Sequence, residues 1–117
     1  MLKIKRVYES VTANDGIRFL VERLWPRGIK KEKLAMKAWL KEVAPSPQLR
    51  KWFAHDPEKW IEFQKRYRAE LNSKPEAWSP ILEAAKQGQV TLLYSARDPE
   101  QNSALLLKAF LEEQMKK

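Results

Sequence analysis

Apolar side chains form three short runs typical of β-strands, two near the start of the chain and one near its end. The first two, residues 2–8 and 17–24, mix β-branched and aromatic residues with charged ones. Residues 90–94 form a continuous apolar run between helical patterns, which is typical of a buried parallel strand in the centre of a sheet. The segment Asn14-Asp15-Gly16 predicts a turn, so a hairpin joining the first two strands is the simplest interpretation and a parallel crossover is the alternative.

Apolar residues recur at helical spacing in the remaining segments. Beyond Gly28 such a pattern runs through residues 34–43 and ends at Ala44-Pro45. Each later pattern starts with a polar residue followed by proline, which suits the first turn of a helix: Ser46-Pro47, Asp56-Pro57, Lys74-Pro75 and Asp98-Pro99. We therefore expect an α/β fold, with a small, mainly parallel sheet of about three strands packed by four to five helices. The expected order along the chain is β-β-α-α-α-α-β-α, within a single domain spanning residues 1–117.

Positive charge is concentrated in the first half of the chain. The formal net charge is +8, and residues 1–53 hold 13 lysines and arginines against 5 acidic residues, whereas residues 54–117 hold 10 of each. A local positive field favours anionic partners such as phosphates, carboxylates or nucleic acid. The alternative is a solvated face that only keeps the protein soluble, made by Lys30, Lys31, Lys33, Lys37 and Lys41.

Composition also excludes several kinds of chemistry. The absence of cysteine excludes disulfides, thiolate metal sites and a cysteine nucleophile, and a single histidine, His55, argues against a zinc site made by protein ligands alone. We therefore predict no metal and no cofactor.

No apolar run approaches the roughly 20 residues that span a bilayer, and the N-terminus lacks the apolar core of a signal peptide. The sequence thus predicts a cytoplasmic protein with no membrane partner.

Several short motifs occur in a specific order along the chain. They are Val7-Tyr8, Arg23-Leu24-Trp25-Pro26-Arg27-Gly28, Trp39-Leu40-Lys41, Ala44-Pro45-Ser46, Leu49-Arg50-Lys51-Trp52-Phe53, His55-Asp56-Pro57 and Leu92-Leu93-Tyr94-Ser95-Ala96-Arg97-Asp98. In this order and spacing the chain resembles the YeaO-like bacterial proteins, domain-of-unknown-function family 488, from about Ile4 to Leu111. The resemblance implies a compact cytoplasmic α/β domain with no assigned reaction or cofactor. The resemblance also implies that longer, more distant relatives carry cysteines in the region matching the strand end at Tyr94-Ser95; this chain has none, so thiol chemistry does not transfer to it.

Polar side chains follow the second and third predicted strands. If these strands are parallel neighbours, their carboxyl ends open on one edge of the sheet, where open α/β folds bind ligands. The residues carried to that edge are Arg23, Trp25, Arg27, Tyr94, Ser95, Arg97, Asp98 and Asn102. The planar guanidinium group of arginine and the free backbone N–H groups at the start of a helix both bind a phosphate or a carboxylate well. Alternatively, Asp98 pairs with the arginines in a structural salt-bridge network.

Three side chains are candidates for general acid or base catalysis: Tyr94, Asp98 and His55. His55 lies beside Asp56 in sequence, near Arg50 and Trp52, but adjacent residues do not orient one another as a catalytic pair does, and capping of a helix explains Asp56 fully. Two interpretations of Trp25 remain open. Its indole is exposed and stacks on a base or ring of a ligand, or it covers the end of the sheet.

Two functions follow from these features. The first is binding of a small anionic ligand at the strand ends, with the question of catalysis left open. The second is a non-enzymatic module that contacts nucleic acid or an acidic protein through the basic N-terminal half, where residues 30–41 supply the lysines. Neither the ligand nor the oligomeric state is specified by the sequence.

Overall fold

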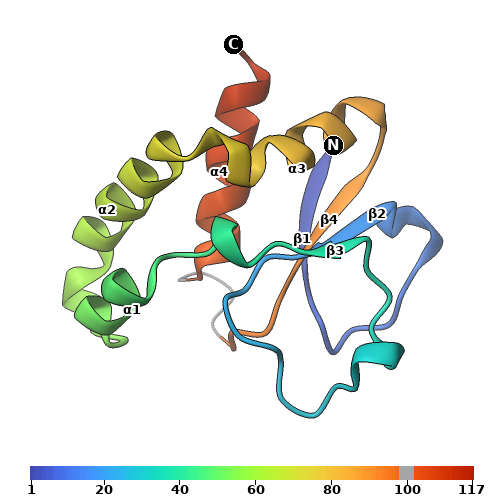
Figure 1. Cartoon of the computed structure of the whole chain (residues 1–117), viewed down its shortest axis with the longest axis horizontal. Helices are drawn as coiled ribbons and strands as arrows, with labels where there is room; N and C mark the ends of the chain where they lie inside the picture. Colours follow the sequence, from blue (N-terminus) through green and yellow to red (C-terminus); the bar gives the residue numbers. More distant parts are fainter. Residues whose placement is uncertain (98–101) are drawn as a thin grey trace.

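The sheet has four strands, all parallel, in a computed structural model that describes residues 1–97 and 102–117. Its strands are β1 (Leu2–Arg6), β2 (Ile17–Leu20), β3 (Ala38–Trp39) and β4 (Val90–Tyr94), in the spatial order β1-β4-β2-β3 (Figure 1). The α/β class is confirmed, and the strand count is four rather than three. The expected hairpin is wrong, because β4 lies between the first two strands and pairs with both: Leu92 is in register with Ile4 on β1 and with Phe19 on β2.

Four α-helices complete the fold: α1 (Pro47–Phe53), α2 (Trp60–Ser73), α3 (Pro75–Gln87) and α4 (Ser103–Met115). The Ser46-Pro47 signal is confirmed, since the Ser46 side chain accepts a hydrogen bond from the Leu49 amide. Asp56 likewise caps a 3-10 turn that leads into α2, accepting from the Glu58 amide at 3.0 Å. The last helix begins later than predicted, with Asn102 as its N-cap. Asp98 and Pro99 lie outside the described residues.

The helix predicted over residues 34–43 is absent. In its place the chain forms a 3-10 turn at Lys31–Lys33, the two-residue strand β3 and a second 3-10 turn at Lys41–Val43. Pairing with β2 decides this outcome, because Ala38 and Trp39 extend the sheet beside Phe19 and Leu20. The lysines of this segment therefore lie on turns and loops, and they do not form one helical face.

The two faces of the sheet are covered differently. One face, including Phe19, Leu92 and Tyr94, packs in the main core with side chains of all four helices. The other face contributes Val7, Leu20 and Leu93 to a smaller cluster with Leu34, and only loop and strand residues complete it: Trp25, Ile29, Met36 and Trp39. In Figure 1, α1, α2 and α4 accordingly lie on one side of the sheet, and long loops occupy the other.

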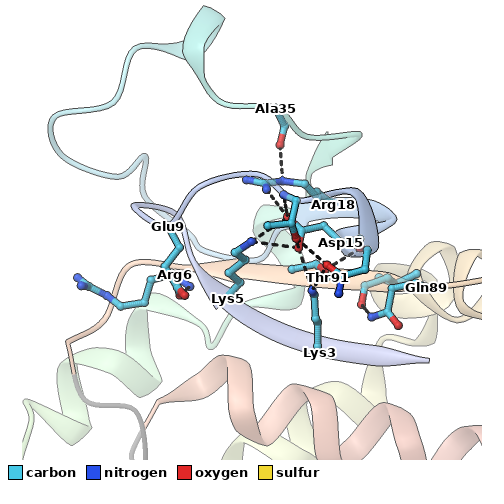
Figure 2. Close-up of polar contacts among 12 residues, drawn as sticks. Lys3, Lys5, Arg6, Glu9, Asp15, Arg18, Ala35, Gln89 and Thr91 are labelled. Carbon is cyan, nitrogen blue, oxygen red and sulfur yellow. Dashed lines mark hydrogen bonds and ion pairs between the residues drawn. The ribbon is translucent and has the colours of Figure 1, made fainter.

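Asp15 is buried on the loop-covered face and joined to three cations. Its carboxylate lies 2.9 Å from the Lys3 ammonium, 3.1 Å from that of Lys5 and 2.6 Å from the Arg18 guanidinium, which is itself buried (Figure 2). The Asp15 carbonyl accepts a hydrogen bond from the Thr91 hydroxyl at 2.7 Å. These contacts hold the pKa of Asp15 well below its ordinary value, with the hydrogen bond from Lys3 as the largest cause. The turn predicted at this position therefore ties β1, β2 and β4 together.

Candidate functional site

The carboxyl ends of β1, β2 and β4 open on one edge of the sheet. Beyond the last paired residues, the Val21 amide donates to the Leu93 carbonyl and the Val7 amide donates to the Tyr94 carbonyl. The loops that start at Glu22 and Ser95 therefore leave the sheet side by side. This neighbourhood is the one that the sequence predicted for the candidate site, and two adjoining cavities lie there.

The larger cavity, about 800 Å³, brings together two groups of candidates that are separate in sequence. Arg23, Tyr94, Arg97 and Asn102 come from the strand ends and the start of α4, whereas Arg50 and His55 come from α1 and the turn after it. Half-buried aromatic residues of the helical side, Phe53 and Trp60, add an apolar wall. The larger cavity thus takes residues from both candidate sites of the sequence.

The smaller cavity, about 430 Å³, lies over the strand ends and is rich in arginine. Its lining includes Arg6, Arg27, Arg50 and Arg97, together with Tyr8, Trp25 and Ser95. Glu22, Leu24, Arg50 and Arg97 line both cavities, so the two are compartments of one cleft. Among the described residues, Glu22 supplies the one carboxylate in either lining.

Glu22 is the main site residue that sequence reasoning missed. Its carboxylate accepts hydrogen bonds from both the amide and the hydroxyl of Ser95, the latter at 3.0 Å, while its carbonyl accepts from the Trp39 indole at 2.6 Å. A carboxylate at the end of an apolar strand was the available signal, because such a group needs donors when it is partly buried. Glu22 therefore fixes the loop after β4 to the end of β2.

Arg23 is largely engaged within the protein. One terminal nitrogen contacts the Glu42 carboxylate at 2.9 Å and the other donates to the Ala44 carbonyl at 3.1 Å. Its buried Nε has no hydrogen-bond partner within residues 1–97 and 102–117. In the structural network predicted from the sequence, Asp98 was the carboxylate that pairs with the arginines, and it lies outside the described residues. The carboxylate that contacts Arg23 in the structure is that of Glu42.

Arg27, Arg50 and Arg97 differ from Arg23. All three side chains are exposed, and within the described part of the chain none forms an ion pair or a side-chain hydrogen bond. Arg6 instead supports the loop after β4, donating to the carbonyls of Ser95 and Ala96 at 3.0 and 3.1 Å. Three guanidinium groups therefore line the arginine-rich compartment without an ion-pair partner among the described residues.

His55 lies at the rim of the larger cavity, on a backbone in the left-handed region. Ala54 has φ 48° and His55 has φ 58°, so the chain reverses sharply after α1. The His55 ring lies 6.3 Å from the Phe53 ring, but its nitrogens have no hydrogen-bond partner in the described part of the chain. Trp52 does not line either cavity, since its ring packs against Arg66 at 4.0 Å and Lys59 at 5.1 Å.

Trp25 and Asn102 have local roles that the structure shows directly. The Trp25 indole donates to the Ile29 carbonyl at 2.6 Å and meets the Trp39 ring edge-on at 5.3 Å, which matches the predicted cover of the sheet end. Its half-buried ring also lines the smaller cavity. The Asn102 side chain caps α4 by accepting from the Leu105 amide at 2.8 Å.

Comparison with known proteins identifies the family of the chain. A family model described as the inactive DUF488-N3 subclade matches residues 1–117. The chain belongs to this DUF488-N3 subclade. It is 44% identical to the uncharacterised protein YeaO of Escherichia coli over 110 residues, which cover 94% of this chain and 96% of YeaO. It is 36% identical to the uncharacterised proteins Rv3073c of Mycobacterium tuberculosis and Mb3100c of Mycobacterium bovis, over 94% of this chain and 92% of each relative. No solved structure matches it significantly.

Arginine side chains are the most frequent charged groups in the cleft of this DUF488-N3 chain. Arginine presents a planar fork that binds an oxyanion through two parallel hydrogen bonds, and several such forks line the cleft. Residues 1–97 and 102–117 contain no cluster of three or more histidine, aspartate or glutamate side chains that could hold a metal ion. None of the helices in these ranges is long and apolar enough to cross a membrane.

Proposed function

We propose that the cleft at the strand ends binds a small ligand that carries a phosphate or a carboxylate. The observation that supports this proposal is the group Arg27, Arg50 and Arg97, whose guanidinium groups lack a carboxylate partner within the described residues. The one carboxylate in the lining among the described residues, that of Glu22, forms no ion pair with these arginines, and its single negative charge does not balance three positive ones. An anionic ligand would supply the missing counter-charge, and its oxygens would match the donors of the forks.

Binding without catalysis is the form of this proposal that we favour. General acid or base catalysis requires a side chain oriented toward its target, commonly by a hydrogen bond from a second group. Neither His55 nor Tyr94 has such a partner in the part of the chain that the structure describes. The description of the family as inactive points the same way. We assign His55 and Tyr94 to contacts with the ligand.

The alternative partner, nucleic acid or an acidic protein, has weaker support. It rests on the lysines between residues 30 and 41, and this segment forms turns and a short strand in place of a helix. The Lys31 and Lys41 ammonium groups lie over the Trp39 ring, at 5.7 and 4.1 Å from its centroid. The structure thus offers no continuous basic helix to a polyanion within its described residues.

Replacing Arg50 with glutamine is expected to weaken anion binding. Inorganic phosphate or citrate should raise the melting temperature of the natural protein by a few degrees, equivalent to about 1.4 kcal/mol at a ligand concentration ten times Kd. Arg50→Gln should remove most of this rise, because Arg50 lines both compartments. Differential scanning fluorimetry over a concentration series measures the effect.

Lys33→Gln is the matched control for this experiment. It removes the same charge from an exposed residue that lines neither cavity, so the rise caused by phosphate should persist. If both variants lost the rise in melting temperature equally, the net charge of the protein, and not the cleft, would explain the effect of phosphate. No stabilisation by any anion in a panel of phosphates and carboxylates would refute the proposed function.

A further inference from the structure

The two compartments of the cleft differ in chemistry. The larger one has the apolar wall of Phe53 and Trp60, with the Tyr94 ring at the end of β4. The smaller one is lined by Arg27, Arg50 and Arg97, whose guanidinium groups form no ion pair with any residue of 1–97 or 102–117. An apolar wall accommodates a ring, and several arginine forks accommodate a phosphate. Because Arg50 and Arg97 line both compartments, cationic groups reach each of them, whereas the apolar wall belongs to the larger one alone.

Glu22 stands at the boundary, because it lines both compartments. Each of its carboxylate oxygens accepts one hydrogen bond from Ser95. A carboxylate offers about four acceptor positions in all, so two remain for a ligand. Its negative charge repels an anionic group at this point and favours a hydroxyl donor. The cleft thus has an apolar wall in the larger compartment, the Glu22 carboxylate where the two compartments meet, and arginines in the smaller compartment.

We infer that the ligand of this cleft is a nucleoside monophosphate. Its base would lie against Phe53 and Trp60, a sugar hydroxyl would donate to Glu22, and its phosphate would lie among the arginines of the smaller compartment. Volumes of about 800 and 430 Å³ fall within the range of small-molecule sites. This inference rests on the proposed function and narrows it from anions in general to one class.

The test compares a nucleotide with its parts on the unaltered protein. Isothermal titration calorimetry would measure the Kd of AMP, GMP, CMP and UMP against ribose 5-phosphate and adenosine. At least one nucleotide should bind on the order of tenfold more tightly than ribose 5-phosphate, because stacking of a base on aromatic side chains contributes about that factor. It should also bind more tightly than adenosine, which lacks the phosphate.

Two substitutions separate the compartments. Arg27→Gln changes only the smaller one, so it should weaken the nucleotide and ribose 5-phosphate by a similar factor, on the order of tenfold, and leave adenosine unchanged. Phe53→Leu changes only the larger one, so it should weaken the nucleotide and leave ribose 5-phosphate unchanged. Because Phe53 also packs against Phe63 at 4.5 Å, far-ultraviolet circular dichroism must show that this variant is folded.

The outcomes distinguish this inference from the proposed function. Equal affinity for ribose 5-phosphate and all four nucleotides would overturn the nucleotide inference and leave anion binding intact. Equal affinity for adenosine and AMP would overturn the phosphate assignment. Absence of binding by every phosphorylated or carboxylated probe would refute the proposed function itself.

Discussion

Gly16→Ala is expected to destabilise the protein by about 3 kcal/mol or more. Gly16 has φ +65°, a backbone conformation that glycine adopts at little cost and that alanine rarely adopts. A methyl group there would also overlap the carbonyl oxygen of Gln89. That oxygen accepts the hydrogen bond from the Ile17 amide at 3.0 Å, so moving it away would disturb the start of β2. Urea denaturation would measure the loss as a lower midpoint.

The other two glycines separate backbone strain from steric overlap. Gly28 has φ +78° but open space around an added methyl group, so Gly28→Ala should cost only about 1 kcal/mol. Gly88 has an extended φ and equally open space, and Gly88→Ala should therefore change stability little. If Gly16→Ala cost no more than Gly28→Ala, the contact with Gln89 would not be the cause.

Asp15→Asn is the second large effect that we expect, a fall in melting temperature of about 10 °C or more. Asparagine keeps the shape of the side chain but removes the charge that Lys3, Lys5 and Arg18 share. Arg18 is only 5% exposed, so its charge would be left in a poorly solvated position. Thermal unfolding followed by circular dichroism would measure the change.

The same residue gives the stability a dependence on acid pH. Because the pKa of Asp15 is lowered in the folded state, its contribution is full above the unfolded pKa, near 4, and is lost as the pH falls further toward the folded pKa. Asp15→Asn should therefore flatten the pH dependence of melting temperature below about pH 4. Glu113→Gln is the control. The pKa of Glu113 is also lowered, with a hydrogen bond from Arg68 as the largest cause, but both side chains of this pair are exposed, so the pair contributes little to stability. A similar loss in both variants would contradict the special role of the buried cluster.

The elements best predicted from the sequence are those with local signals. The apolar run of β4 and the Ser46-Pro47 cap each depend on neighbouring residues, and both are confirmed. Residues 34–43 were predicted wrongly because their apolar spacing also fits a helix, and the pairing of Ala38 with Phe19, distant in sequence, decides their structure. The position of β4 between β1 and β2 is likewise a long-range property.

The part of the site that the sequence predicted is the part carried by the ends of the parallel strands. The convergence of Arg23, Tyr94 and Arg97 follows from strand ends that open on one edge. The arrival of Arg50 and His55 in the same cavity depends on how α1 docks, through Ser46 and Glu70 of α2 among other contacts, and no local pattern encodes that. The place of Glu22 at the boundary between the compartments depends on its bonds to Ser95, 73 residues away.

The edges of the sheet bear on how this protein avoids aggregation. An exposed edge strand offers unpaired backbone groups to a second molecule, and charged side chains or very short strands discourage such pairing. At one edge, β1 carries Lys3 and Lys5, which Asp15 holds in place, and at the other β3 is only two residues long. The ion cluster that anchors the turn at Asp15 thereby also keeps positive charge along β1, where it opposes the addition of a strand from another molecule.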